Sequence, residues 1–289
     1  MNAHQERLER FLRESPWEYE AVKTHLRNAA PEAVQGTGTA LIVDGMGIPK
    51  KGNHSVGVYR QWCGATGKLD NCQVTVNCTL ARPGDGYNSD TITWPLGMRL
   101  YLPKKWAGED DSVYDNQAER EDYARRREKA EIPEEVGYQP KYGIAINQIE
   151  AAIEASIEHA CVIADTNYGM RSPFRKQLRS LNESYVLDIE TDRLYVVPED
   201  ADIIEPGQTS GPGAPRTHRT VPDEFEMETA VDVAERVTDD AWTAVVWNEG
   251  TKESLTGLFY RDRIQVVSNA SGSIARMIAI ASSSSAWRV

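Results

Sequence analysis

Two aspartates, Asp44 and Asp165, stand where their side chains could do chemistry together. Each follows a short apolar run, residues 40–43 in the first case and 160–164 in the second, and each run is typical of a buried strand that carries an acid at its tip. Carboxylate oxygens are hard ligands that suit Mg²⁺ or Mn²⁺ better than zinc. Two such ions could activate a water or a 3′-hydroxyl and stabilise the leaving oxygen of a phosphodiester.

The alternative interpretation is that both aspartates simply end strands or cap turns, as aspartate often does. Repetition favours the shared site, because the same strand, acid and glycine-containing turn occur twice, each with basic residues downstream. Those basic residues are Lys50, Lys51, His54, Arg171 and Arg175. They are either contacts for DNA phosphates or ordinary solvated surface positions.

Composition restricts the class of protein. The 289 residues carry 44 acids and 32 bases, a net charge of −12, which excludes a general nucleic-acid coat. Any contact with DNA must therefore come from local basic patches. No apolar run approaches the roughly eighteen residues of a membrane span, and the start of the chain lacks the apolar region of a signal peptide. We expect a cytoplasmic protein without a membrane partner, whose four cysteines are reduced thiols.

The elements that must position the two acids can be predicted from periodicity. Alternating apolar residues in 74–80 and 92–102, separated by a turn signal, predict strands that form an antiparallel meander with the strand before Asp44. Apolar residues three or four apart predict a helix over 141–158 that packs on this sheet. We expect the charged residues 107–135 to form a solvated helix or an arm.

The chain divides into four predicted parts. Residues 1–35 predict two short helices, 36–197 an α/β core with a mixed sheet flanked by helices, 198–268 a linker and an inserted α+β subdomain, and 269–289 an atypical tail. Acids that follow neighbouring strands of such a core would meet at the carboxyl edge of the sheet, where α/β proteins place ligands.

Several segments carry a family resemblance. In chain order they are RESPWEYEAV, VDGMGIPKKGNHSVGVYRQWCGATGKLDNCQV, RLYLPKKWA, IPEEVGYQPK, VIADTNYG and WNEGTKESLTGLF. In order and spacing they resemble the DDE superfamily of insertion-sequence transposases, over nearly the whole chain. The resemblance implies an RNase H-like fold with an inserted β-rich subdomain, and cleavage and joining of DNA at terminal inverted repeats. It also implies a homo-oligomer on DNA, two Mg²⁺ or Mn²⁺ ions held by three acids, Asp44 as the first acid and Asp165 as the second.

The chain departs from that pattern at two places. Gly45 stands where the family commonly has another acid, and residues 269–289 contain no acid at all where the resemblance would place the third one. We therefore expect a chain that ends before the third acid. Other acids stay open as substitutes: Glu183, Asp188, Glu190 and Glu249.

Three hypotheses remain at this point. The chain is a transposase-derived endonuclease, or a catalytically dead fragment that binds element DNA and interferes with the intact enzyme, or an unrelated RNase H-like nuclease of the host. Tyr168 and Arg171, just past the second acid, could stack on or clamp a displaced nucleotide, although Tyr168 could equally pack in the core.

Overall fold

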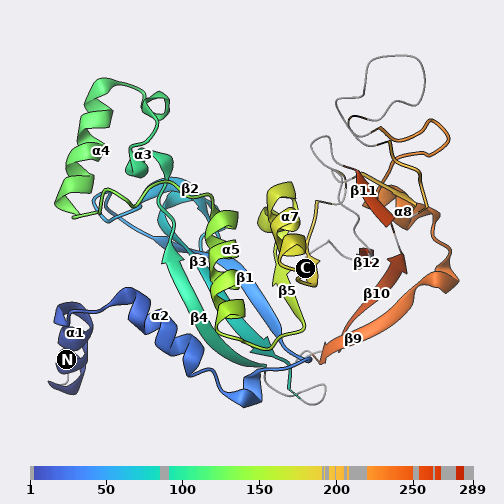
Figure 1. Ribbon diagram of the computed structural model, residues 1–289, viewed down its shortest axis with the longest axis horizontal. Coiled ribbons are helices and arrows are strands. Elements are labelled where there is room, and N and C mark those ends of the chain that lie inside the picture. Colours follow the sequence, from blue (N-terminus) through green and yellow to red (C-terminus); the bar gives the residue numbers. More distant parts are fainter. Residues whose placement is uncertain are drawn as a thin grey trace.

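A six-stranded mixed sheet forms the centre of the molecule (Figure 1). The computed structural model describes residues 3–84, 91–190, 192, 195–198, 200–204, 207, 220–249, 254–262, 264–267 and 278–282. The strands of the central sheet are β1 (Ala40–Pro49), β2 (Tyr59–Cys63), β3 (Lys68–Arg82), β4 (Ile92–Leu100), β5 (Cys161–Ala164) and β6 (Tyr185–Leu187). Their order is β2-β3-β1-β5-β6, with β4 also paired to β3.

Pairing directions follow the expected RNase H-like plan. Strand β1 is antiparallel to β3, and β3 is antiparallel to β4, which confirms the predicted meander. Strand β5 is parallel to β1, and β6 is parallel to β5, because helices connect them. Strand β2, which the sequence did not indicate, pairs with the first residues of β3. The predicted mixed α/β core is thus confirmed.

Burial alternates along β1 and shows which face of the sheet is covered. Leu41 and Val43 are fully buried, whereas Ile42 between them is 36% exposed. The buried face packs against α5 (Lys141–Glu154) and α7 (Ser172–Ser180), which contribute residues such as Ile149 and Phe174 to one continuous core. The helix that periodicity predicted over 141–158 therefore exists, and it ends four residues earlier at Glu154.

The opposite face of the sheet keeps apolar side chains in contact with solvent. Ile42, Ile163 and Val186 are aligned across β1, β5 and β6 by register, and each is exposed by a third or more. Asp44 shares the parity of Ile42 along β1 and so belongs to this open face. Asp44 thus starts from the face that α5 and α7 leave uncovered.

Two helices precede the sheet, as predicted for residues 1–35. They are α1 (Ala3–Glu14) and α2 (Tyr19–Asn28), followed by a 3₁₀ turn at Glu32–Val34. Helix α2 packs on the edge strand β4, where the Trp94 indole donates a 2.8 Å hydrogen bond to the carbonyl of Leu26. Figure 1 shows α1 projecting beyond this contact.

The charged stretch 107–135 is a docked helix rather than an arm. Helix α3 (Lys104–Ala107) and a 3₁₀ turn (Asp111–Val113) lead into α4 (Gln117–Lys129), which buries no residue. Arg127 nevertheless ties α4 down by donating hydrogen bonds to the carbonyls of Trp106 and Pro133. The solvated character of α4 was predicted correctly. Its hydrogen bonds to the neighbouring segments could not be predicted from the composition.

The remaining strands form two smaller sheets. One contains β7 (Tyr195–Pro198), β8 (Glu228–Thr229) and β11 (Ile264–Val267), and the other contains β9 (Thr243–Glu249), β10 (Ser254–Asp262) and β12 (Ile278–Ser282). Helix α8 (Ala230–Arg236) and a 3₁₀ turn (Asp239–Ala241) lie between β8 and β9 in sequence. Much of the expected linker, 205–219 apart from Gly207, lies outside the described residues. Within the described chain, no helix has the length and apolar character that crossing a bilayer requires.

Burial on the covered face of β1 can be tested by a matched pair of substitutions. Leu41→Ala should lower the free energy of unfolding by about 2–5 kcal/mol, because it leaves a cavity under α5. Ile42→Ala, one residue away on the open face, should cost about 1 kcal/mol or less. Urea denaturation monitored by tryptophan fluorescence measures both. Equal losses would show that both faces of β1 are covered.

Candidate functional site

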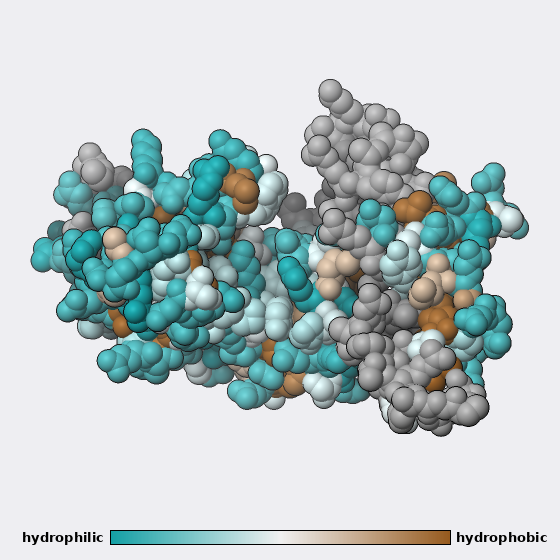
Figure 2. Space-filling model, turned by 90° about the horizontal axis from the view of Figure 1, so that it is seen from above, coloured by the Kyte–Doolittle hydropathy of each residue, from teal (hydrophilic) through white to brown (hydrophobic). Residues whose placement is uncertain are grey.

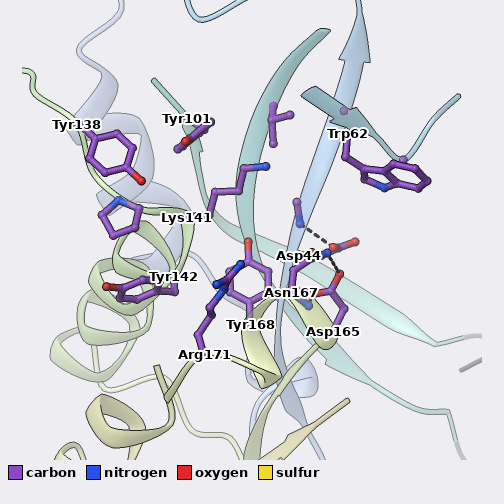
Figure 3. A pocket seen from close by; sticks show the side chains of 15 residues that line it. Asp44, Trp62, Tyr101, Tyr138, Lys141, Tyr142, Asp165, Asn167, Tyr168 and Arg171 are labelled. Carbon is purple, nitrogen blue, oxygen red and sulfur yellow. Dashed lines mark hydrogen bonds between the residues drawn. The ribbon is translucent and has the colours of Figure 1, made fainter. Parts of the chain in front are cut away.

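Asp44 and Asp165 are the first residues beyond the same parallel ladder. Pairing of β1 with β5 runs from Ala40↔Cys161 to Val43↔Ala164, so both aspartates come next on neighbouring strands. Figure 3 shows the two carboxylates side by side. One detail differs from expectation: Asp44 is not at a strand tip, because β1 continues to Pro49 and pairs there with β3. The sequence thus predicted the neighbourhood correctly and the strand end wrongly.

The electrostatics of Asp44 reflect this neighbourhood. Partial burial raises the pKa of its carboxyl above the usual value, the backbone N–H of Gly45 lowers it, and the negative charge of Asp165 raises it again. Asp44 Oδ1 accepts that N–H at 2.6 Å. Within the described residues, Asp44 Oδ2 accepts no hydrogen bond and remains available to a ligand.

Asp165 caps the short helix α6 (Thr166–Gly169). Its Oδ1 accepts the backbone N–H of Asn167 at 3.0 Å, and its Oδ2 accepts the side-chain amide of the same residue at 2.8 Å. The alternative of a capping aspartate is therefore correct as far as it goes. The Asp165 carboxylate can still bind a cation while it caps the helix, because each of its oxygens has a second lone pair.

Gly169, at the end of α6, is the glycine that follows the second acid, and close packing requires a glycine there. A Cβ on Gly169 would come within 1.8 Å of the Asp188 carbonyl oxygen, so only glycine fits here. Asp188 follows β6 at the same edge of the sheet, where its N–H donates to the Ala164 carbonyl at 3.1 Å and its Oδ2 accepts the Thr166 hydroxyl at 2.5 Å. Asp188 is thus close to the residue that follows Asp165 in the fold, although two helices and a strand separate them in sequence.

The other open candidates for a third acid are Glu183, Glu190 and Glu249. Glu183 precedes β6 at the opposite end of the strand and contacts His159 Nε2 at 2.9 Å. Glu190 places its backbone N–H against the Met170 sulfur, and the side chain of Glu249 is outside the described part of the structure. No group of three or more His, Cys, Asp or Glu residues among those described is arranged to hold a metal ion.

A cavity of about 570 Å³ opens beside the two aspartates. Acids lie on one side of it, and tyrosines with two cations, Lys141 and Arg171, on the other (Figure 3). The residues that line it are Asp44, Gly45, Gly47, Trp62, Gly64, Val74, Tyr101, Tyr138, Pro140, Lys141, Tyr142, Asp165, Asn167, Tyr168 and Arg171. Sequence reasoning missed Lys141 and Tyr101, whose approach depends on how α5 meets the sheet.

The predicted DNA contacts fall into different settings. Arg171 is exposed and lines the cavity. Lys50, Lys51 and His54 belong to the loop between β1 and β2, outside the cavity lining, where Lys51 and His54 are exposed and Lys50 is half-buried. This loop is held in place, because the Asn71 amide donates to the carbonyls of Lys50 and Gly52 at 2.9 and 2.8 Å.

Arg175 requires a correction. Its side chain was expected to reach DNA, but the residue is only 5% exposed and its guanidinium donates to the Gly169 carbonyl. Helix α7 turns this position toward the core, next to Phe174, instead of toward solvent. Arg175 therefore supports the turn after Asp165 and leaves the set of candidate DNA contacts.

The space-filling view gives the surface setting of the site. Figure 2 shows hydrophilic residues covering most of the visible face, with scattered apolar groups. This fits the net charge of −12 and leaves DNA attraction to local cations.

Comparison with known proteins assigns the family. The chain belongs to the DDE superfamily endonucleases, whose family profile matches residues 1–254. It is also 27% identical over 190 residues to the probable transposase for insertion sequence element IS701 from Microchaete diplosiphon. That match covers 65% of this chain and 42% of the relative, so the chain spans less than half of the relative's length. The resemblance to insertion-sequence transposases of the DDE type is confirmed.

A methyl group at Gly169 should disturb the turn that holds Asp165. Gly169→Ala should destabilise the fold by about 1–3 kcal/mol, because the obstructing atom is a backbone carbonyl that cannot swing away. Gly64→Ala is the matched control from the same cavity, since a Cβ there meets no atom within 4 Å. Chemical denaturation compares the two, and an unchanged Gly169→Ala variant would contradict the close approach.

Neutralising Asp44 should stabilise the metal-free protein. A raised pKa in the folded state means that the charged carboxylate opposes folding above that pKa, and that the effect vanishes at acid pH below the unfolded value. Asp44→Asn should thus be more stable than the wild type at pH 7 in EDTA, with a difference that closes as the pH falls toward 4. Asp110→Asn should be less stable than the wild type at pH 7, and its deficit should persist down to pH 4, because hydrogen bonds from Ser112 lower the pKa of Asp110 below its ordinary value. Denaturation curves between pH 4 and 8 test both signs.

Proposed function

We propose that this chain is the catalytic core of a transposase that cleaves and joins phosphodiesters at the ends of an insertion sequence. The observation that supports it best is the position of Asp44 and Asp165, side by side beyond one parallel ladder of an RNase H-like sheet. Family membership and the name of the relative point the same way. Because the chain spans only 42% of that relative, the activity of a whole transposase is part of the proposal.

The donor set fits hard divalent cations. Two carboxylates that raise each other's energy by repulsion would gain from a shared cation, and each keeps oxygen lone pairs that the fold does not use. Oxygen ligands of this kind suit Mg²⁺ or Mn²⁺. Two bound ions would activate the attacking water or 3′-hydroxyl and stabilise the leaving oxygen. Asp188 is the described acid best placed to complete the site, since it lies at the same sheet edge.

The residues around the acids would bind the DNA backbone. Arg171 faces the cavity and could neutralise a phosphate near the acids, while Lys50, Lys51 and His54 extend the positive surface along the β1–β2 loop. We propose terminal inverted repeats as the DNA partner, a homo-oligomer on the paired ends, and a cytoplasmic location.

A second candidate function is a catalytically dead fragment that binds element DNA and interferes with the intact enzyme. It is favoured by one observation: the described residues bring no cluster of three or more acids or other metal ligands together. Both functions predict binding of DNA ends, and only the first predicts cleavage.

Cleavage of a plasmid that carries the inverted repeats distinguishes the two functions. With Mg²⁺ or Mn²⁺ the wild type should nick the repeat ends, and Asp44→Asn and Asp165→Asn should reduce nicking to background, because each removes a metal ligand. Asp188→Asn should do the same if Asp188 is the third ligand. Glu183→Gln, at the opposite end of β6, is the control that should nick normally.

Other outcomes assign the chain differently. Salt-dependent binding of repeat DNA without any nicking by the wild type supports the dead fragment. Nicking that survives both Asp44→Asn and Asp165→Asn contradicts the proposed site. Absence of DNA binding at low salt contradicts both functions.

A further inference from the structure

The hydroxyl of Tyr168 is a buried donor without a partner. Tyr168 is 3% exposed, and its ring packs against Phe174 with the ring centroids 5.5 Å apart. Its phenolic oxygen makes no hydrogen bond within the part of the chain that the structure describes. Leaving such a group unpaired costs about 1–3 kcal/mol, so a hydroxyl of this kind at a cavity wall is well placed to donate to an acceptor bound there.

The hydroxyl lies at the wall of the cavity, beside Gly45. A Cβ on Gly45 would stand 3.8 Å from the Tyr168 oxygen, an ordinary contact distance, so glycine leaves this part of the wall uncrowded. Figure 3 shows the hydroxyl pointing into the cavity, on the side of Asp44 that faces Lys141. Burial and the charges of Asp165 and Asp44 raise the pKa of Tyr168, which keeps the phenol protonated and able to donate.

A cation faces the same space. Lys141 is the first residue of α5, and its Nζ lies 5.0 Å from the centroid of the Tyr101 ring, which holds the side chain by a cation–π contact. Burial lowers the pKa of Lys141, while the charges of Cys72 and Asp165 act in the opposite direction.

The start of α5 is a third group in the cavity that favours an anion. Pro140 precedes the helix and no side chain caps it, although Pro140, Lys141 and Tyr142 all line the cavity. The N-terminus of a helix of 14 residues attracts anions through its free N–H groups and its dipole. A phenol donor, an ammonium and a helix N-terminus thus meet in one cavity, and all three favour an anion.

We propose that Tyr168, Lys141 and the N-terminus of α5 bind one backbone phosphate of the DNA strand, adjacent to the phosphodiester held at Asp44 and Asp165. The inference rests on the proposed function, because it takes the two aspartates as the place of cleavage. It adds a second anchoring point that fixes the register of the strand, with Tyr168 and Lys141 as direct phosphate ligands. The acids repel an unaccompanied phosphate, so the subsite lies on their Lys141 side.

The test measures binding of repeat-end DNA in EDTA, by fluorescence anisotropy, so that metal and cleavage play no part. Tyr168→Phe should weaken binding about tenfold, since it removes a hydrogen bond to a charged acceptor. Lys141→Gln should weaken binding at least as much. Tyr142→Phe is the matched control, because the Tyr142 hydroxyl points away from the cavity and its loss should leave the affinity unchanged (Figure 3).

A scan of neutral methylphosphonates, one per duplex, locates the phosphate. At one position near the cleavage site the wild type should lose tenfold or more, and there the combined loss with Tyr168→Phe should be smaller than the product of the two separate losses, because both changes weaken the same contact. Losses that add at every position would overturn the proposal. So would wild-type affinity in Tyr168→Phe.

Further measurements distinguish a failure of this inference from a failure of the proposed function. Tyr168→Phe should be as stable as the wild type or more stable, because it removes an unpartnered buried hydroxyl, whereas a structural hydroxyl would make it less stable. Failure of the wild type to bind DNA overturns the proposed function and this inference together. Normal wild-type binding without coupling to Tyr168 overturns the inference alone. If a free deoxynucleoside monophosphate raised the melting temperature as much as repeat-end DNA does, the subsite would be a nucleotide site, and the assignment to DNA would be overturned.

Discussion

The short parallel ladder between β1 and β5 is the constraint on which the site depends. It pairs residues 40–43 with 161–164 and then stops, so the next residue of each strand is an aspartate. Because β1 continues beyond Asp44 along β3, the first acid is fixed by a strand on one side and left accessible on the other. Asp165 is fixed differently, by capping α6. Two acids are thereby held together although their charges repel.

The same region gives up stability in several small ways. Two like charges are neighbours, and Lys141 lies against the Tyr101 ring. Among the described residues, the buried Tyr168 hydroxyl has no hydrogen-bond partner. Each arrangement costs stability, and bound cations and phosphates would relieve it. The buried face of the sheet, packed by α5 and α7 around Leu41 and Ile149, supplies the stability that allows this.

Much of the core and half of the site could be predicted from the sequence. Alternation and apolar runs were enough for β1, β3, β4 and β5, and the repeated strand, acid and glycine pattern predicted that Asp44 and Asp165 would follow neighbouring strands. The continuation of β1 past Gly45 could not be predicted, because glycine and proline are turn signals and only pairing with β3 overrides them. The burial of Arg175 depends on which side of α7 faces the core. That Lys141 and Tyr168 line one cavity depends on how α5 crosses the sheet, which no local pattern encodes.

Crystals soaked in Mn²⁺ show whether Asp44 and Asp165 jointly hold divalent metal. Joint coordination predicts anomalous difference density between the two carboxylates in the wild type, and none there in Asp44→Asn crystals treated in the same way. Manganese bound elsewhere while the space between Asp44 and Asp165 stays empty would contradict it. Density beside Asp188 as well would identify the third ligand.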